Sequence, residues 1–297
     1  MGGFIVYELI QVSELCYYVQ CPAKIGVVRT EENNVVLIDS GNDKNAGKKA
    51  LKILEQRHWR LQAVFNTHSH ADHIGGNRFL QERTGCKIYA PGIERDFTCH
   101  PVLEPTFLYG GCPPSELRHK FLMAQESDAL PLTPDALPDG MSVIPLPGHS
   151  FDMVGFRAKD NVVFLADCLS SRETLEKYRV SFLTDVKSYL ETLERVINMD
   201  AAMFIPSHAE ATADIRALAQ YNRDTVHQIA DDILNICREP LNFESILQRL
   251  FAEYGLVMNF EQYALVGSTA RSYLTWLKEC GRLRAFFENN ALLWVCA

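Results

Sequence analysis

The chain has 297 residues, of which 47% are hydrophobic and 22% charged. This composition excludes collagen-like and disordered classes and permits a sizeable core, and at about 150 residues per domain the length predicts two domains. The net charge of −8 disfavours broad binding to nucleic acid. No apolar run approaches the roughly 18 residues of a membrane helix, so no membrane span is expected.

Short runs of β-branched and aromatic residues predict strands in the first forty residues. The expected elements up to residue 90 are strands at 4–12, 16–19, 25–29 and 35–38, a helix at 43–57, a strand at 63–65, a helix at 75–83 and a strand at 86–90. From about 91 to 147 the chain holds ten of its 13 prolines. Because proline restricts the backbone and lacks an N–H donor, this Pro-rich insertion is expected to be mostly loop, with one helix at 115–124.

Strand and helix signals return after the insertion, and the end of the chain is almost wholly helical. We expect strands at 141–144, 153–157, 162–166 and 202–205, helices at 185–197, 215–237, 243–254 and 260–280, and a hairpin at 282–296. Two sheets covered by helices would bury these apolar runs in an α/β layered fold. The sequence thus predicts an α/β domain at 1–210 and a small, mostly helical, winged-helix-like domain at 211–297.

The densest polar cluster is the run Thr67-His68-Ser69-His70-Ala71-Asp72-His73, directly after an expected strand. A tight turn at a strand end can aim its imidazoles and carboxylate at one point, and such ligands suit zinc, iron or manganese. Four further residues stand at strand ends or turns: Asp39, His149, Asp167 and His208. Repeated Asp and His residues at strand ends indicate a polar, metal-binding pocket at one edge of a pair of sheets.

This ordered set resembles the metallo-β-lactamase superfamily over roughly the first 210 residues. The resemblance implies an αββα sandwich with two divalent metal ions, zinc in the first place and iron or manganese as alternatives. It implies that His68, His70 and His149 hold one ion, that Asp72, His73 and His208 hold the second, and that Asp167 bridges them. Asp39 would orient the ligands through hydrogen bonds.

The resemblance also implies an enzyme, a dinuclear metallohydrolase. A hydroxide bridging the metals would attack a thioester, ester or lactone, with Asp72 and Asp167 as the catalytic carboxylates. The run from Thr67 to Gly76 is similar to glyoxalase-II-like thioesterases, whereas the C-terminal region is closer to the lactamase-beta-two-like branch. Two alternatives remain open, namely a phosphodiesterase or ribonuclease on the same site and a mononuclear iron sulfur dioxygenase.

The insertion and the C-terminal region are the expected sources of specificity. Tyr109, Arg118, His119 and Lys120 are candidate substrate-binding residues for an anionic group, with a solvated helix face as the alternative. From residue 211 onward, eight basic residues stand against ten acidic ones, which disfavours nucleic acid as a partner. We expect a small-molecule substrate and a homodimer through the C-terminal domain, and the scattered cysteines favour the cytoplasm.

Overall fold

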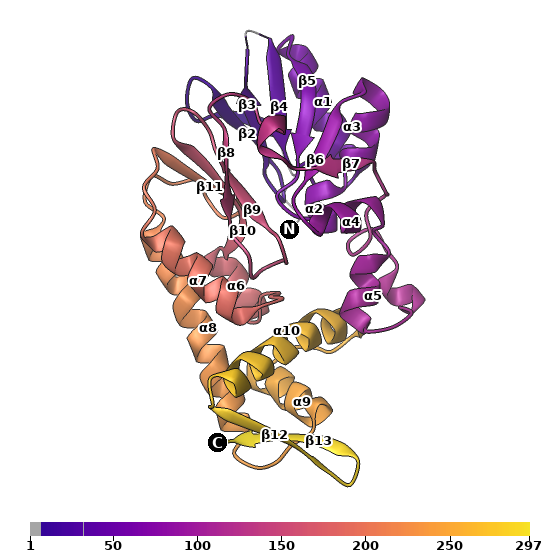
Figure 1. The fold of residues 1–297 in the computed structure, drawn as a ribbon, viewed down its shortest axis with the longest axis vertical. Helices are drawn as coiled ribbons and strands as arrows, with labels where there is room; N and C mark the ends of the chain where they lie inside the picture. Colours follow the sequence, from indigo (N-terminus) through magenta and orange to yellow (C-terminus); the bar gives the residue numbers. More distant parts are fainter. Residues whose placement is uncertain (1–6, 32) are drawn as a thin grey trace.

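Two facing sheets form the centre of the fold in a computed structural model that describes residues 7–31 and 33–297 (Figure 1). The larger sheet has the spatial order β1 to β7, antiparallel from β1 to β4 and parallel from β4 to β7. Its strands are β1 (Glu8–Gln11), β2 (Cys16–Gln20), β3 (Ile25–Arg29), β4 (Asn34–Ile38), β5 (Arg60–Phe65), β6 (Lys87–Ala90) and β7 (Ala129–Pro131). The strand expected at 4–12 is confirmed from Glu8 to Gln11, and its residues 4–6 lie outside the described residues.

The smaller sheet has four strands in the order β11-β10-β9-β8, with only the β10–β11 pair parallel. The strands are β8 (Ser142–Pro145), β9 (Val154–Arg157), β10 (Val162–Ser170) and β11 (Met203–His208). Buried apolar side chains of both sheets meet between them, among them Phe65 and Phe156, whose ring centroids lie 5.9 Å apart. Burial of these residues on both inner faces fixes the sheets against each other.

Helices cover the outer faces of both sheets. The larger sheet packs against α1 (Lys44–Gln56) and α3 (Asn77–Thr84), which contribute Leu54 and Leu80 to that core. The smaller sheet packs against α7 (Val186–Ile197) and α8 (Arg216–Ile236). The predicted αββα sandwich is therefore confirmed.

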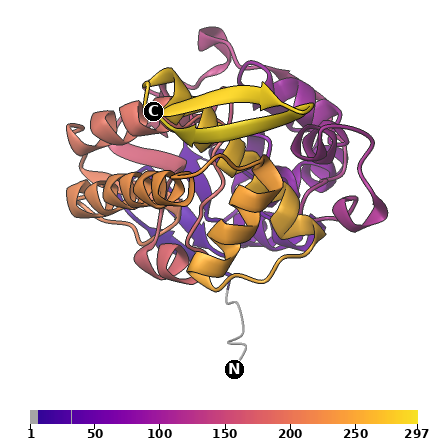
Figure 2. The same cartoon turned by 90° about the horizontal axis from the view of Figure 1, so that it is seen from below.

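Three structural elements follow the long helix α8 at the C-terminal end (Figure 1). They are α9 (Phe243–Tyr254), α10 (Phe260–Glu279) and a hairpin of β12 (Leu283–Glu288) and β13 (Ala291–Cys296). Figure 2 shows the hairpin lying across these helices. A C-terminal helical domain is thus present, while its boundary at 210 and its winged-helix character stay predictions.

Residues 91–147 are mostly irregular, as expected, but the helix expected at 115–124 is wrong, and two helices of the segment were missed. The segment forms α4 (Glu94–Cys99), α5 (Leu103–Tyr109) and strand β7, whereas Ser115–Leu117 and Pro134–Ala136 are only short 3₁₀ turns. Pro105 stands in the first turn of α5, where a missing N–H breaks no helical hydrogen bond. A proline can therefore accompany a helix start, which is why the sequence analysis missed α5.

A further short helix, α6 (Arg172–Tyr178), was also missed, although Ser171 caps it by accepting a hydrogen bond from the Thr174 N–H.

Within residues 7–31 and 33–297, no helix has the length and apolar character that crossing a bilayer requires.

Candidate metal centre

The predicted ligand residues all lie at one edge of the two facing sheets. His68 follows β5, and the one-turn helix α2 (Ala71–Ile74) carries Asp72 and His73. His149 stands in the turn between β8 and β9, Asp167 lies within β10, and His208 ends β11. Segments far apart in the sequence thereby contribute to a single site.

The first cluster consists of three histidines, His68, His70 and His149. Nδ1 of His70 lies 3.0 Å from Nε2 of His68 and 3.0 Å from Nε2 of His149. Burial, together with the neighbouring histidines, holds the pKa of His68 well below its usual range. Burial likewise lowers the pKa of both His70 and His149 to about 4. All three rings are therefore neutral near pH 7, which is the form that binds a metal ion.

The second cluster contains Asp72, His73, Asp167 and His208. Nε2 of His208 lies 3.1 Å from a carboxylate oxygen of Asp72 and 3.1 Å from one of Asp167. Oδ2 of Asp167 is also 3.6 Å from Nε2 of His149 in the first cluster. Asp167 therefore stands between the two clusters, as a bridging ligand would.

Charge in the second cluster differs from that in the first. Burial alone would lower the pKa of His73, but the carboxylates of Asp167, Asp72 and Asp39 hold it well above its ordinary range. In His208 the Asp167 and Asp72 carboxylates likewise outweigh burial and raise the pKa to about 10. Without metal, two protonated histidines thus offset part of the negative charge of the three carboxylates.

Two unsatisfied atoms test whether this arrangement fits a metal ion. Among the residues that the structure describes, Nε2 of His73 and Oδ1 of Asp167 are buried and find no hydrogen-bond partner, although they lie 3.1 Å apart. The angles between them do not allow a hydrogen bond, so both atoms would be satisfied by a third group that contacts them together. A cation coordinated by His and Asp fits that requirement and the donor set.

Unusual backbone positions aim these side chains. His70 is the extended N-cap residue of α2, so the chain turns sharply between His68 and His73. Ala166 has a φ of 52° and lies at a register shift between β10 and β11, which redirects the following Asp167. Gly148 has a φ of 121°, and a Cβ there would lie 2.3 Å from the backbone N of Tyr189. The turn that presents His149 therefore requires glycine.

Asp39 lies behind the second cluster, where the sequence predicted an orienting residue. Its carboxylate accepts hydrogen bonds from the Thr67 N–H and from the Thr67 hydroxyl, each at 2.8 Å. It also lies 2.8 Å from Nδ1 of His73. Nδ1 of His68 lies 3.0 Å from the Thr67 hydroxyl, so Asp39 and Thr67 together orient a ligand in each cluster.

The carbonyl oxygens of two loops orient two further imidazoles, those of His149 and His208. Nδ1 of His149 lies 3.0 Å from the carbonyl oxygen of Phe182. Nδ1 of His208 lies 3.0 Å from that of Pro22. Such bonds fix the tautomer that leaves Nε2 free for a metal ion.

Glu94 is a buried residue of the site that the sequence analysis missed. It is fully buried on α4 of the insertion. One carboxylate oxygen accepts hydrogen bonds from the N–H and hydroxyl of Ser69, and the other from the Ser150 hydroxyl and the Asp152 N–H. Glu94 thus ties the His68–His70 turn to the His149 turn. No local pattern marks it, because its partners are more than 20 residues away.

The candidate substrate-binding residues of the insertion lie apart from one another. Tyr109 lines a groove of about 790 Å³ between α5 and α10. His119 lies 3.8 Å from Glu261, Lys120 pairs with Asp43 at 3.3 Å, and Arg118 is exposed. Their part in substrate binding stays a prediction.

A smaller cavity of about 150 Å³ adjoins both clusters. Its wall includes His70 and Asp72 together with Glu104 of α5, Phe182, and Glu261 of α10. Burial, with the nearby carboxylates of Glu94 and Asp72, raises the pKa of Glu104 to about 8. The insertion and the C-terminal domain therefore both border the site.

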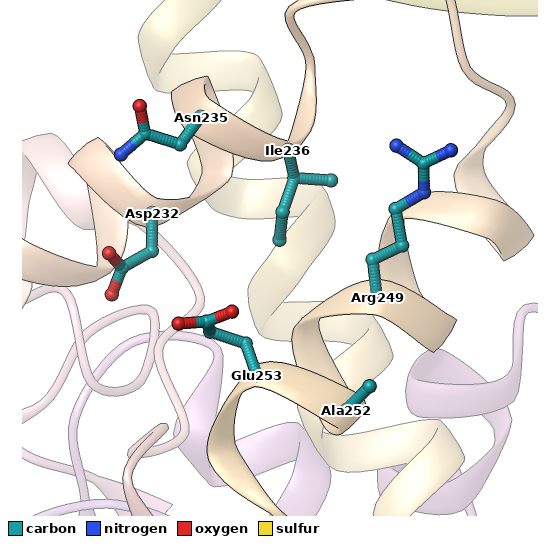
Figure 3. A pocket seen from close by; sticks show the side chains of 6 residues that line it. All are labelled: Asp232, Asn235, Ile236, Arg249, Ala252 and Glu253. Atoms are coloured by element: carbon teal, nitrogen blue, oxygen red, sulfur yellow. The ribbon is translucent and has the colours of Figure 1, made fainter.

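A different pocket, of about 520 Å³, lies between α8 and α9 and is lined by none of the metal-ligand candidates. Figure 3 shows Asp232 and Glu253 on one side of it, with the guanidinium of Arg249 pointing away from both. We assign it no role in the reaction.

We expect Glu94→Ala to lower the free energy of unfolding by about 3–5 kcal/mol, because four buried donors lose their acceptor. Urea unfolding measures this, and zinc content should fall in the same variant. The control Glu55→Ala, at an exposed position of α1, should stay within about 0.5 kcal/mol. A Glu94→Ala protein as stable as the wild type would contradict the role given to Glu94.

The two clusters should bind zinc with different pH dependence. His73 and His208, with raised pKa values, must release protons to bind, so affinity at the second cluster should rise about tenfold per pH unit for each proton displaced. Affinity at the first cluster should change little from pH 6 to 8, because His70 and His149 with pKa about 4 are already neutral. Calorimetry in buffers of different ionisation enthalpy counts the protons, and equal release at both sites would refute this.

Curated proteins similar to this chain are hydroxyacylglutathione hydrolases. The one from Methylobacillus flagellatus is 27% identical over 140 residues, which is 47% of this chain and 44% of that protein. The one from Hyphomonas neptunium is 48% identical over 42 residues, 14% of this chain and 16% of that protein. The chain thus spans less than half the length of these two relatives.

Solved structures share the fold over nearly the whole chain. A β-lactamase domain protein from Burkholderia ambifaria matches with a TM-score of 0.72 at 17% identity, covering 98% of this chain and 94% of that one. A metallo-β-lactamase family protein from Thermus thermophilus matches with a TM-score of 0.69 at 17% identity, covering 97% of each chain. Residues 18–208, which hold all seven ligand candidates, also match the family model described as the metallo-beta-lactamase superfamily. The chain belongs to the metallo-β-lactamase superfamily, as its sequence motifs predicted.

Proposed function

We propose that the protein is a hydrolase that cleaves a thioester, ester or lactone with the help of two divalent metal ions. The observation that carries the proposal is the pair of adjoining clusters, His68, His70 and His149 beside Asp72, His73, Asp167 and His208. Zinc suits this donor set, and iron or manganese would also fit it. When bound, such ions supply Lewis acidity and lower the pKa of water at the site.

The chain's own residues position the reaction. Asp167 places negative charge between the clusters, within 3.6 Å of histidines from both. The side chain of Asp72 is 40% exposed and lines the cavity, so it can accept a proton there and pass it to a leaving group. Phe182 packs its ring against His70 and His149 and limits water on that side.

Among the three substrate classes we favour a thioester, because the curated relatives are named hydroxyacylglutathione hydrolases. The substrate would be a small molecule. The alternative of a nuclease gains no support from α10, the helix that borders the cavity: Arg271 packs over the ring of Phe243 at 3.8 Å, and Lys278 pairs with Glu279 at 3.0 Å. Seven ligand candidates in two clusters also favour two metals over a single iron.

We also propose a cytoplasmic location and a contact between two copies through the C-terminal domain. All nine cysteines are unpaired, which suits a reducing compartment.

On the β12–β13 hairpin, Phe287 is 80% exposed and Leu292 is 38% exposed, an apolar surface that a second copy would cover. Sedimentation analysis of the full chain tests the dimer.

We expect Asp167→Ala to lower kcat/KM at least about 1000-fold, since both metal sites lose a ligand and their shared charge. The assay is a parallel panel of thioester, lactone and phosphodiester substrates, with metal content measured on the same preparations. Asp200→Ala removes an exposed aspartate far from the clusters and should match the wild type. Two metals in the wild type and unchanged hydrolysis in Asp167→Ala would together refute the site.

A further inference from the structure

Glu104 is a buried carboxylate without a hydrogen-bond partner. Its residue is only 9% exposed, and it lines the 150 Å³ cavity together with His70 and Asp72. Nε2 of the neutral His70 lies 3.7 Å from one of its oxygens, which is beyond hydrogen-bond length. Within residues 7–31 and 33–297, no donor reaches the carboxylate. A buried carboxylate left in this state is costly unless a ligand supplies the donor.

Negative charge surrounds this carboxylate. Asp72 and Glu261 line the same cavity, and the carboxylate of Glu94 acts on Glu104 as well. No lysine or arginine is among the residues of the cavity wall. Two basic side chains of the insertion contact this wall without pairing with Glu104: His119 lies 3.8 Å from Glu261, and Lys120 pairs with Asp43 at 3.3 Å and lies over the ring of Phe121 at 5.1 Å.

The rest of the wall is apolar and aromatic. Leu122, Leu265 and Phe182 form an apolar part of the wall, and Phe121 stands at the cavity with 61% of its surface exposed. An aromatic face beside a carboxylate suits an organic cation, because the ring quadrupole and the negative charge attract the same group. A substrate carboxylate in this cavity would instead meet the negative charge of Asp72 and Glu261.

We propose that the cavity beside the metal clusters binds a primary ammonium group on the acyl part of the substrate, with Glu104 as its acceptor. The proposal rests on the hydrolase function above and narrows its substrate class to aminoacyl thioesters or esters. It assigns specificity to Glu104 of the insertion, a residue outside the seven ligand candidates. The binding of an anionic group expected for Arg118, His119 and Lys120 is a separate prediction about the outer surface of the insertion.

The test compares four thioesters of N-acetylcysteamine that differ only in the acyl group: alanyl, 2-hydroxypropanoyl, propanoyl and malonyl. The zinc-loaded wild type should prefer alanyl over propanoyl by about 10- to 100-fold in kcat/KM and should disfavour malonyl. In Glu104→Leu the alanyl-to-propanoyl ratio should fall to about one while the protein still holds two metals. Glu104→Gln should lose most of the ammonium preference, and the exposed Glu116→Gln of the same insertion should keep it.

Binding measurements keep the inference testable if no thioester is hydrolysed, a result that would count against the proposed function alone. Calorimetry compares alanine, lactate and propanoate on the zinc-loaded wild type and on Glu104→Gln. Tighter binding of alanine that disappears in the variant supports the proposal. Equal binding of alanine and propanoate, or a preference for lactate, overturns it. Loss of metal from both Glu104 variants also overturns it, because Glu104 would then act by holding His70.

Discussion

The buried carboxylate of Asp167 is the group on which both clusters depend. Its side chain is 11% exposed and lies within 3.6 Å of His73, His149 and His208. Removing such a charge from water costs several kcal/mol unless opposite charge accompanies it. Protons on His73 and His208 supply that charge without metal, and bound cations would supply it in their place. In either case positive charge offsets the Asp167 carboxylate at the same place.

The backbone has to depart from regular geometry to hold this arrangement. Asp39, with φ 63°, and Ala166, with φ 52°, lie in the left-handed region although neither is glycine. Such positions cost of order 1–3 kcal/mol each and persist only where the surroundings impose them. The surroundings do so, because Leu165 and Ala166 of β10 are buried in the core between the smaller sheet and its helices, and the Asp39 N–H donates to the carbonyl oxygen of Phe65 at 3.0 Å. Strain near the metal centre is thus offset by packing of the sandwich.

Features with a pattern among neighbouring residues could be predicted from the sequence, whereas features that depend on contacts between distant residues could not. Strands such as Ile25–Arg29 and the helix Phe243–Tyr254 follow from apolar periodicity within a few residues, and their positions were correct. The clustering of His68 to His73 with His149, Asp167 and His208 was expected because strand ends share one edge. The role of Glu94 could not be predicted, because it depends on hydrogen bonds with Ser69 and Ser150, which only the folded chain brings close to Glu94. The helices of the insertion were missed because proline was read as a breaker, whereas in α5 it stands in the first turn.

The contrast between Glu94 and Glu104 shows how the insertion serves two purposes. Both are buried glutamates ten residues apart on neighbouring short helices. Glu94 accepts four hydrogen bonds from the two ligand-bearing turns, so its burial is fully compensated within the chain and its role is to hold the site together. Glu104 has no such compensation, yet Leu108 and Leu122 beside it pack against Ala264 of α10 and keep it enclosed. The donor that the chain does not supply to Glu104 can come from a substrate group, because the cavity that Glu104 lines adjoins the metal clusters.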